Sequence, residues 1–221
     1  MKNLLEQNYH KITATLPAHV QLVAVSKTHP AEEILEVYHL GQRLFGENKV
    51  QELVAKYETL PKDIRWHLIG HLQTNKVKYI APFVDMIESV DSGKLLREID
   101  RQAEKNHRNI SVLLQVKIAE EDTKTGMEIS ETKELFQQYL EGAFPHITVK
   151  GLMGMATFTA DQEQIRREFS FLKTFYDRLS QTHPLEILSM GMSDDYPVAI
   201  DCGANNVRVG SAIFGKRNYP V

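Results

Sequence analysis

The chain has 221 residues, 42% hydrophobic and 25% charged, so it is long enough to bury a sizeable core without disulfide bonds. Its 26 basic and 29 acidic residues give a formal net charge of −3, which argues against a nucleic-acid or membrane-surface partner. One cysteine excludes an intramolecular disulfide, the N-terminus lacks the apolar region of a signal peptide, and no apolar run spans a bilayer, so we expect a cytoplasmic protein.

Strand-like and helix-like segments alternate along the chain, after a first helix expected over residues 2–15. Eight short apolar runs read as buried strands, and they cover residues 21–25, 43–46, 65–69, 86–90, 111–118, 149–155, 186–190 and 207–214. Helical spacing or capping residues predict helices between them, over residues 31–37, 50–57, 73–80, 92–99, 130–136 and 161–179.

This alternation predicts a parallel sheet with right-handed crossovers, and eight strands favour a closed (β/α)8 barrel, a TIM barrel, over an open sheet. No linker or low-complexity stretch divides the chain, so we expect residues 1–221 to form a single domain. Ligands bind at the carboxyl ends of the strands in such folds. Polar residues that follow the apolar runs are therefore the candidates for chemistry.

Lys27 follows the first apolar run, at the end of the segment Val20 to Ser26. Burial disfavours an ammonium, so a lysine at a buried strand end is expected to have a lowered pKa and a nucleophilic neutral fraction. Such an amine forms a Schiff base with an aldehyde cofactor. The alternative is a lysine whose stem is buried and whose ammonium extends into solvent.

The segment from Ser189 to Asp195 follows the seventh run and is the strongest candidate for binding a phosphate. Gly191 allows backbone amides to approach a ligand, Ser189 and Ser193 offer hydroxyls, and a helix start offers oriented N–H groups. The alternative is that Ser193 is only a helix N-cap and Gly191 only a turn residue.

Arg208, Gly210 and Ser211 lie in the eighth run, and the loops after strands seven and eight are the usual phosphate site of this barrel. Gly210 and Ser211 are expected to supply further amide donors to the same phosphate. Arg208 would point inward, and a buried guanidinium needs partners because it cannot lose its charge. Those partners are a carboxylate such as Asp201 or Glu47, or the ring nitrogen of a cofactor.

Asn48 follows the second run, where it would bind a cofactor hydroxyl or, more commonly, cap the next helix. His67 and His71 are four residues apart, but they run from strand into loop, so we expect no metal site. Cys202 has no spacing that suggests a catalytic dyad, and no nucleotide-binding glycine motif follows a strand.

Taken together, these pieces resemble the pyridoxal phosphate homeostasis protein family, which is similar to the N-terminal domain of alanine racemase. The matching stretches keep the family's order and run from Val23 to Thr28, Phe45 to Asn48, Trp66 to Lys76, Gly151 to Ala156, Leu188 to Asp195 and Arg208 to Gly215. One small departure is Ser211, where relatives often carry threonine; both residues bring a hydroxyl.

The resemblance implies one (β/α)8 barrel of the alanine racemase N-terminal-domain type, with an extra N-terminal helix and pyridoxal 5′-phosphate bound to Lys27. It implies phosphate contacts from four residues, Arg208 near the pyridine nitrogen, and Asn48 near the cofactor ring. The four phosphate contacts are Ser189, Ser193, Gly210 and Ser211.

Two expectations argue against efficient racemisation, which needs an electron sink and acid/base groups on both faces of the substrate carbon. Alanine racemase takes one of those groups from a C-terminal domain, for which the residues after the eighth run leave no room. An arginine at the ring nitrogen would also weaken the electron sink. We therefore expect a monomeric carrier that buffers pyridoxal phosphate (vitamin B6) or delivers it to apo enzymes. A racemase, or a barrel enzyme whose Lys27 attacks a phosphorylated substrate, is the alternative.

Overall fold

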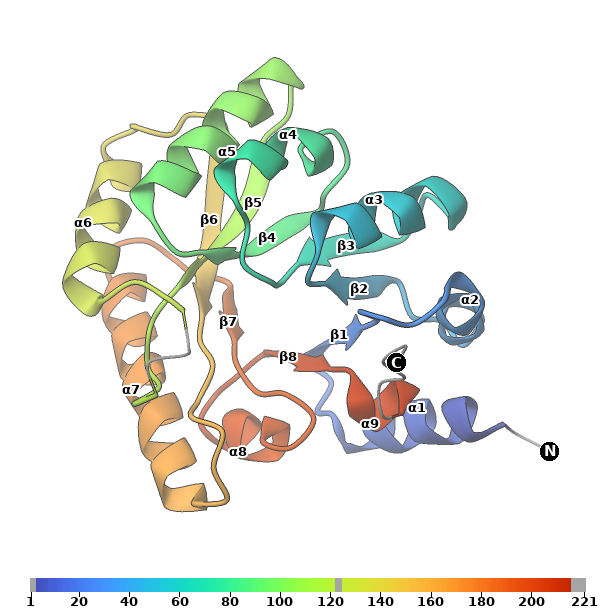
Figure 1. Cartoon of the computed structure of the whole chain (residues 1–221). Coiled ribbons are helices and arrows are strands. Elements are labelled where there is room, and N and C mark those ends of the chain that lie inside the picture. The colour runs from blue at the N-terminus through green and yellow to red at the C-terminus, as the bar shows by residue number, and fades with distance from the viewer. Residues whose placement is uncertain (1–2, 122–124, 216–221) are drawn as a thin grey trace.

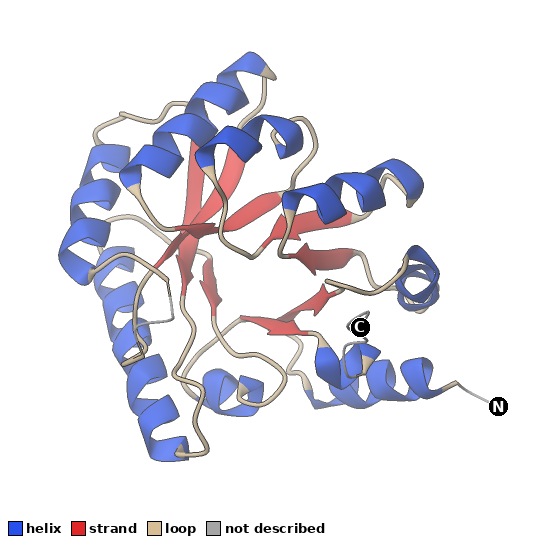
Figure 2. Cartoon of the chain, in the orientation of Figure 1, coloured by secondary structure: helices blue, strands red, loops and turns tan. Residues whose placement is uncertain are grey.

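Eight parallel strands close into a barrel in chain order, with β1 hydrogen-bonded to both β2 and β8 (Figures 1 and 2). The computed structural model describes residues 3–121 and 125–215. The strands are β1 (Gln21–Val25), β2 (Leu44–Glu47), β3 (Arg65–Leu68), β4 (Met86–Val90), β5 (Ile110–Gln115), β6 (Ile147–Met153), β7 (Ile187–Ser189) and β8 (Asn206–Val209). The closed (β/α)8 fold predicted from the alternating pattern is confirmed.

Helices surround the barrel, because each crossover between parallel strands places one on its outer face (Figure 2). They are α1 (Leu4–Thr15), α2 (Ala31–His39), α3 (Val50–Thr59), the 3₁₀ turn η1 (Thr74–Lys76), α4 (Val77–Ile80), α5 (Gly93–Lys105), α6 (Ile129–Leu140), α7 (Gln162–Ser180), α8 (Tyr196–Asp201) and α9 (Ser211–Phe214). The predicted N-terminal helix is α1, whose Asn8 side chain donates to the Ile213 carbonyl of α9 at 3.2 Å.

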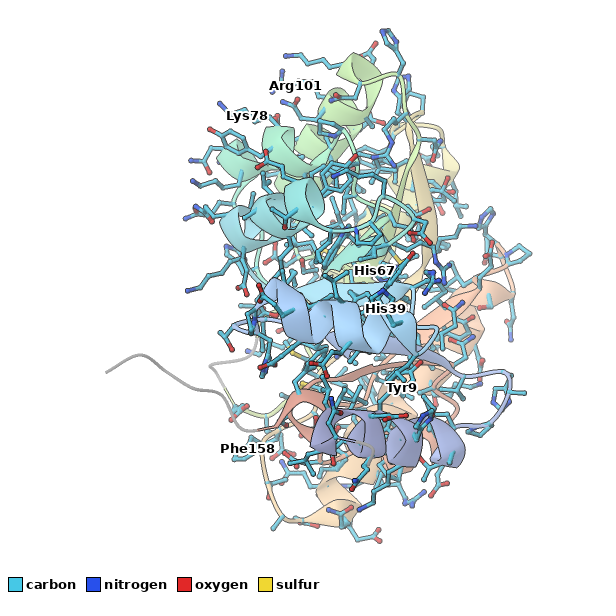
Figure 3. All side chains as sticks on the ribbon, turned by 90° about the vertical axis from the view of Figure 1, so that its right-hand side faces the viewer. Tyr9, His39, His67, Lys78, Arg101 and Phe158 are labelled. Carbon is cyan, nitrogen blue, oxygen red and sulfur yellow. The ribbon has the colours of Figure 1, made fainter. Side chains whose placement is uncertain are left out.

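The main apolar core lies between the strands and the surrounding helices, and a smaller cluster of Met86, Leu113 and Met153 is separate from it. The side view shows His67 in the middle of the molecule, whereas Lys78 and Arg101 project from helices at its edge (Figure 3). Both faces of the strands are buried, which explains why the strands read as continuous apolar runs.

The last predicted strand, over residues 207–214, is only partly correct. The strand β8 ends at Val209, and Ser211–Phe214 form the short helix α9. Gly210 makes the turn between them, where an added Cβ would lie 3.0 Å from the Val25 carbonyl oxygen. A short apolar run does not by itself distinguish strand from helix, which is why the sequence pattern joined the two elements.

Candidate functional site

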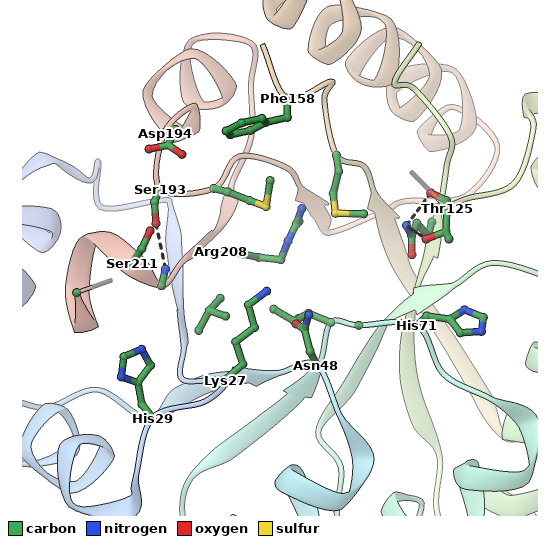
Figure 4. Close-up of a pocket in the computed structure, with 18 residues that line it drawn as sticks. Lys27, His29, Asn48, His71, Thr125, Phe158, Ser193, Asp194, Arg208 and Ser211 are labelled. Carbon is green, nitrogen blue, oxygen red and sulfur yellow. Dashed lines mark hydrogen bonds between the residues drawn. The ribbon is translucent and has the colours of Figure 1, made fainter. Parts of the chain in front are cut away.

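A cavity of about 430 Å³ opens at the carboxyl ends of the strands (Figure 4). Its volume is in the range of small-molecule sites. Six of the seven residues predicted to bind a cofactor line it, and these are Lys27, Asn48, Ser193, Arg208, Gly210 and Ser211. These residues come from opposite ends of the sequence. They meet because the closed barrel places β1 beside both β2 and β8. Ser189 is the exception.

Lys27 lies two residues beyond the end of β1 and is half-buried. Its side chain points into the cavity, toward Arg208 (Figure 4). It is therefore neither enclosed in the apolar core nor extended into bulk solvent. The next residue, Thr28, has φ of 68°, a left-handed conformation that β-branched residues rarely adopt. This turn redirects the chain from the strand toward α2.

Arg208 forms part of the cavity lining from β8 and is only 3% exposed. Its Nη2 donates to the Gly154 carbonyl at 3.0 Å, and its Nη1 donates to Ser189 Oγ at 2.6 Å. Among the described residues, the carboxylate that pairs with it is Glu88 of β4, with Oε2 3.9 Å from Nη1. The guanidinium is thus held by the barrel interior, as a charge that cannot be shed requires.

The suggested carboxylate partners of Arg208 were wrong. Asp201 instead faces Arg166 at 3.3 Å, and Glu47 pairs with Lys56 at 2.7 Å. Glu88 is 120 positions before Arg208, and only closure of the barrel brings them together. A charged residue inside the apolar run Met86–Val90 was the signal that could have identified Glu88.

Glu88 is itself held by His67 of β3, whose Nδ1 lies 2.6 Å from Glu88 Oε1. Burial alone would lower the pKa of His67, but its hydrogen bonds to Asp85 and Glu88 outweigh that effect and raise it. Burial would likewise raise the pKa of Glu88, yet the hydrogen bond with His67 is part of a balance that lowers it. Both groups are therefore favoured in their charged forms.

Ser189 is fully buried in the barrel interior and does not line the cavity. Its hydroxyl donates to Glu88 Oε2 at 2.6 Å and accepts from Arg208 Nη1 and from Asn206 Nδ2 at 2.9 Å. The structure therefore does not bring this hydroxyl to the predicted phosphate position, because the side chain of a strand residue points into the barrel interior here. Ser189 instead accepts a hydrogen bond from Arg208 and so helps to fix the position of its guanidinium.

The other phosphate candidates do meet. Ser193 Oγ accepts from the backbone amides of Gly210 and Ala212, both at 3.3 Å, and so joins the loop after β7 to the start of α9. Figure 4 shows the contact with Gly210. The N-cap alternative for Ser193 is not what the structure shows, since Asp195 occupies that position before α8. Gly191 has φ of 93°, and a Cβ there would lie 2.6 Å from that of Ala199.

Asn48 lines the cavity and does not cap α3, whose N-cap is Lys49. Its Oδ1 is buried and has no hydrogen-bond partner among the described residues. Buried polar atoms are nearly always hydrogen-bonded, so an unsatisfied oxygen at the wall of a cavity indicates a site for a ligand donor or a bound water. This observation favours the binding role of Asn48 over the capping role.

Cavity residues from β5, from the loop after β6 and from the rim are not predicted by the sequence pattern. Gln115 donates to the Thr125 carbonyl at 2.8 Å, and His29 stacks on Phe214 with ring centroids 4.9 Å apart. Phe158 stands 81% exposed at the rim (Figure 4). An exposed aromatic residue has no periodic signal in the sequence, so only the structure reveals its place.

The two histidines considered as metal ligands have different partners and lie in different surroundings. His67 is in the barrel interior, whereas His71 pairs with Asp91 at 2.9 Å. Within residues 3–121 and 125–215, no group of three or more His, Cys, Asp or Glu side chains is placed to hold a metal ion. No helix in this same part of the chain has the length and apolar character needed to cross a membrane.

The family model for the alanine racemase N-terminal domain matches residues 2–218. A pyridoxal phosphate homeostasis protein from Aquifex aeolicus is 43% identical over 202 residues, covering 90% of this chain and 88% of the relative. One from Vibrio alginolyticus is 37% identical, covering 97% and 98%.

Among solved structures, PipY of Synechococcus elongatus with PLP bound superposes with a TM-score of 0.87 at 37% identity, covering 96% of this chain and all of PipY. Alanine racemase of Clostridium difficile superposes with a TM-score of 0.81 at 18% identity, covering 98% of this chain and 57% of the racemase. At that identity the racemase likeness shows the fold alone.

Proposed function

Because the chain belongs to the family of the pyridoxal phosphate homeostasis proteins, with the alanine racemase N-terminal domain as its fold, we propose that it binds pyridoxal 5′-phosphate and maintains its cellular pool. The observation that carries this proposal is that Lys27 and Arg208 line one cavity together with Ser193. PipY, whose structure holds PLP, has the same fold at 37% identity.

The residues around the cavity fit this cofactor. Lys27 would hold the aldehyde, Arg208 would face the pyridine nitrogen, and Asn48 Oδ1 would accept from a cofactor donor. The amides of Gly210 and Ala212 and the hydroxyls of Ser193 and Ser211 would bind the phosphate. These amides now donate to Ser193 Oγ over 3.3 Å, a long distance that an anionic oxygen would improve on.

Bound pyridoxal phosphate supplies an electrophilic aldehyde and an electron-withdrawing ring. The neutral Lys27 amine would attack the aldehyde carbon, and the carbonyl oxygen would leave as water, giving a Schiff base. Arg208 is always cationic and would donate to the ring nitrogen, which keeps that nitrogen unprotonated. An unprotonated ring is a weak electron sink, which suits storage of the cofactor better than turnover of amino acids.

We further propose that residues 1–221 act as one cofactor-binding domain in the cytoplasm. The protein would work as a monomer that buffers the cofactor or delivers it to apo forms of pyridoxal-phosphate enzymes. A size-exclusion measurement with light scattering tests the monomer, and a dimer would overturn that part alone.

The decisive experiment locates the modified lysine. Purified protein is incubated with pyridoxal phosphate, reduced with borohydride, digested and measured by mass spectrometry. We expect a single adduct on Lys27 that is lost in Lys27→Ala and kept in Lys173→Ala, a control on the outer helix α7. An adduct confined to another lysine, or a protein that stays colourless with excess cofactor, would reject the proposal.

An amino-acid racemase is the alternative outcome. The holoprotein is assayed with D- and L-alanine and with other amino acids. We expect no efficient turnover. Racemisation that disappears in Lys27→Ala would move the function from cofactor homeostasis to catalysis.

A further inference from the structure

Polar and charged groups from the chain on either side of Lys27, from β2 and from α3 meet in what we call the Lys56 cluster, of which Ser26, Glu47 and Lys56 are buried. It consists of Ser26, Thr28, Glu47, Glu52 and Lys56. Lys56 of α3 is only 7% exposed and donates to three oxygens, each at 2.7 Å: the Ser26 carbonyl, Glu47 Oε1 and Glu52 Oε1. An ammonium has three hydrogens, so this set satisfies it fully.

The cluster forms hydrogen bonds to the backbone on both sides of Lys27. The Ser26 carbonyl belongs to the peptide group before Lys27, and it accepts from Lys56. The Thr28 amide belongs to the peptide group after Lys27, and it donates to Glu52 Oε1 at 2.6 Å. Both peptide groups that flank the Lys27 Cα are therefore tied to one helix, α3, through Lys56 and Glu52.

This attachment also holds an unfavourable backbone conformation. Thr28 has φ of 68°, in the left-handed region, which costs free energy for a residue other than glycine. Such a conformation persists only where its surroundings fix it, and the hydrogen bond from the Thr28 amide to Glu52 is a contact that does so. Relaxation of Thr28 would rotate the peptide group next to Lys27 and so redirect the lysine side chain.

Stability alone does not account for the cluster. Glu47 is fully buried, its Oε2 has no partner among the described residues, and burial raises its pKa to about 7 despite Lys56. Buried ion pairs often contribute little to stability compared with apolar side chains of the same size. A charged cluster at this cost is explained better by the geometry that it fixes around Lys27.

We propose that Lys56 and Glu52 are positioning residues that hold the backbone of Lys27 so that its amine is presented to the cavity and the cofactor is released slowly. This inference rests on the proposed function, since it concerns the lysine that would carry pyridoxal phosphate. Neither residue lines the cavity, so both act through the Lys27 backbone.

The test compares Glu52→Ala, Glu52→Gln and Lys56→Met with a control, Asp177→Ala. Asp177 forms a helix pair with Lys173 at the same four-residue spacing, on α7. Each protein is loaded with pyridoxal phosphate, transferred to excess semicarbazide, and followed by the loss of Schiff-base absorbance over pH 6 to 9. Circular dichroism and thermal unfolding confirm that each variant is folded.

We expect Glu52→Ala to release the cofactor about tenfold faster, the scale for losing one charge-assisted hydrogen bond. Glu52→Gln keeps an acceptor for the Thr28 amide and is expected to restore slow release, whereas Asp177→Ala leaves the rate unchanged. Lys56→Met is expected to release the cofactor faster still and to shift the pH dependence of the release rate. Because Glu52 is only partly buried, its variants keep the test valid if Lys56→Met does not fold.

The outcomes separate this inference from the proposed function. If the wild type forms its adduct on Lys27 and Glu52→Ala releases the cofactor at the rate of Asp177→Ala, the inference is overturned and the function stands. If Glu52→Gln releases as fast as Glu52→Ala, the tie to the Thr28 amide is not the cause, which also overturns it. If the wild type forms no adduct on Lys27, both fail.

Discussion

The substitution Glu47→Gln tests how a buried carboxyl group with a raised pKa changes the stability of the protein with pH. The carboxyl group is fully buried at the end of β2, where it accepts from Ser26 Oγ at 2.6 Å and from Lys56 Nζ at 2.7 Å. Burial raises its pKa from 4.5 to about 7, against the opposing effects of Lys56 and Ser26. Glutamine keeps the shape and an acceptor oxygen but does not titrate.

The direction in which the free energy of unfolding changes with pH follows from proton binding at Glu47. Between pH 4.5 and about 7 the folded protein binds more protons at Glu47 than the unfolded chain does, so the free energy of unfolding falls as the pH rises. Below this window the group contributes no such loss, and above it the loss is complete. At about 1.4 kcal/mol for each pH unit, the full loss is ~3 kcal/mol.

Urea unfolding of the wild type and Glu47→Gln at several values from pH 5 to pH 8 measures this effect. We expect the stability of the variant relative to the wild type to rise with pH, by most of ~3 kcal/mol, and to level off above about pH 7. Taking the difference between the two proteins cancels the titration of the other groups. A difference that stays constant over this range would refute the raised pKa of Glu47.

Three further outcomes are expected. Ser193→Ala should weaken cofactor binding by ~1–3 kcal/mol, the scale for a hydrogen bond to a charged group, and equilibrium dialysis that finds equal affinity would place the phosphate elsewhere. Asn48→Ala should weaken cofactor binding but leave the melting temperature of the apo protein nearly unchanged, because Oδ1 has no partner to lose among the described residues; a large drop in melting temperature would show a structural role. Gly191→Ala should destabilise the fold by ~1–3 kcal/mol, since φ is 93° and Ala199 occupies the space, and unchanged urea unfolding would contradict this reading.

The amino-acid sequence by itself determined the class of fold and six of the residues that line the cavity. Strands buried on both faces are continuous apolar runs, and helices with one buried face show a repeating apolar stripe, so their alternation predicts a (β/α)8 barrel. Polar residues directly after those runs, such as Lys27 and Asn48, share one rim because parallel strands end on the same side. These features depend on local order along the chain, which a sequence displays directly.

Only the tertiary structure decided which residues meet across the barrel. Ser189 and Ser193 are four residues apart, yet one supports Arg208 from the interior and the other reaches the amides of α9. Glu88 reaches Ser189 and Arg208 only because β4 lies across from β7 and β8 in the closed sheet. Contacts of this kind depend on barrel closure and on the direction of each side chain, and neither is encoded in the spacing of residues along the chain.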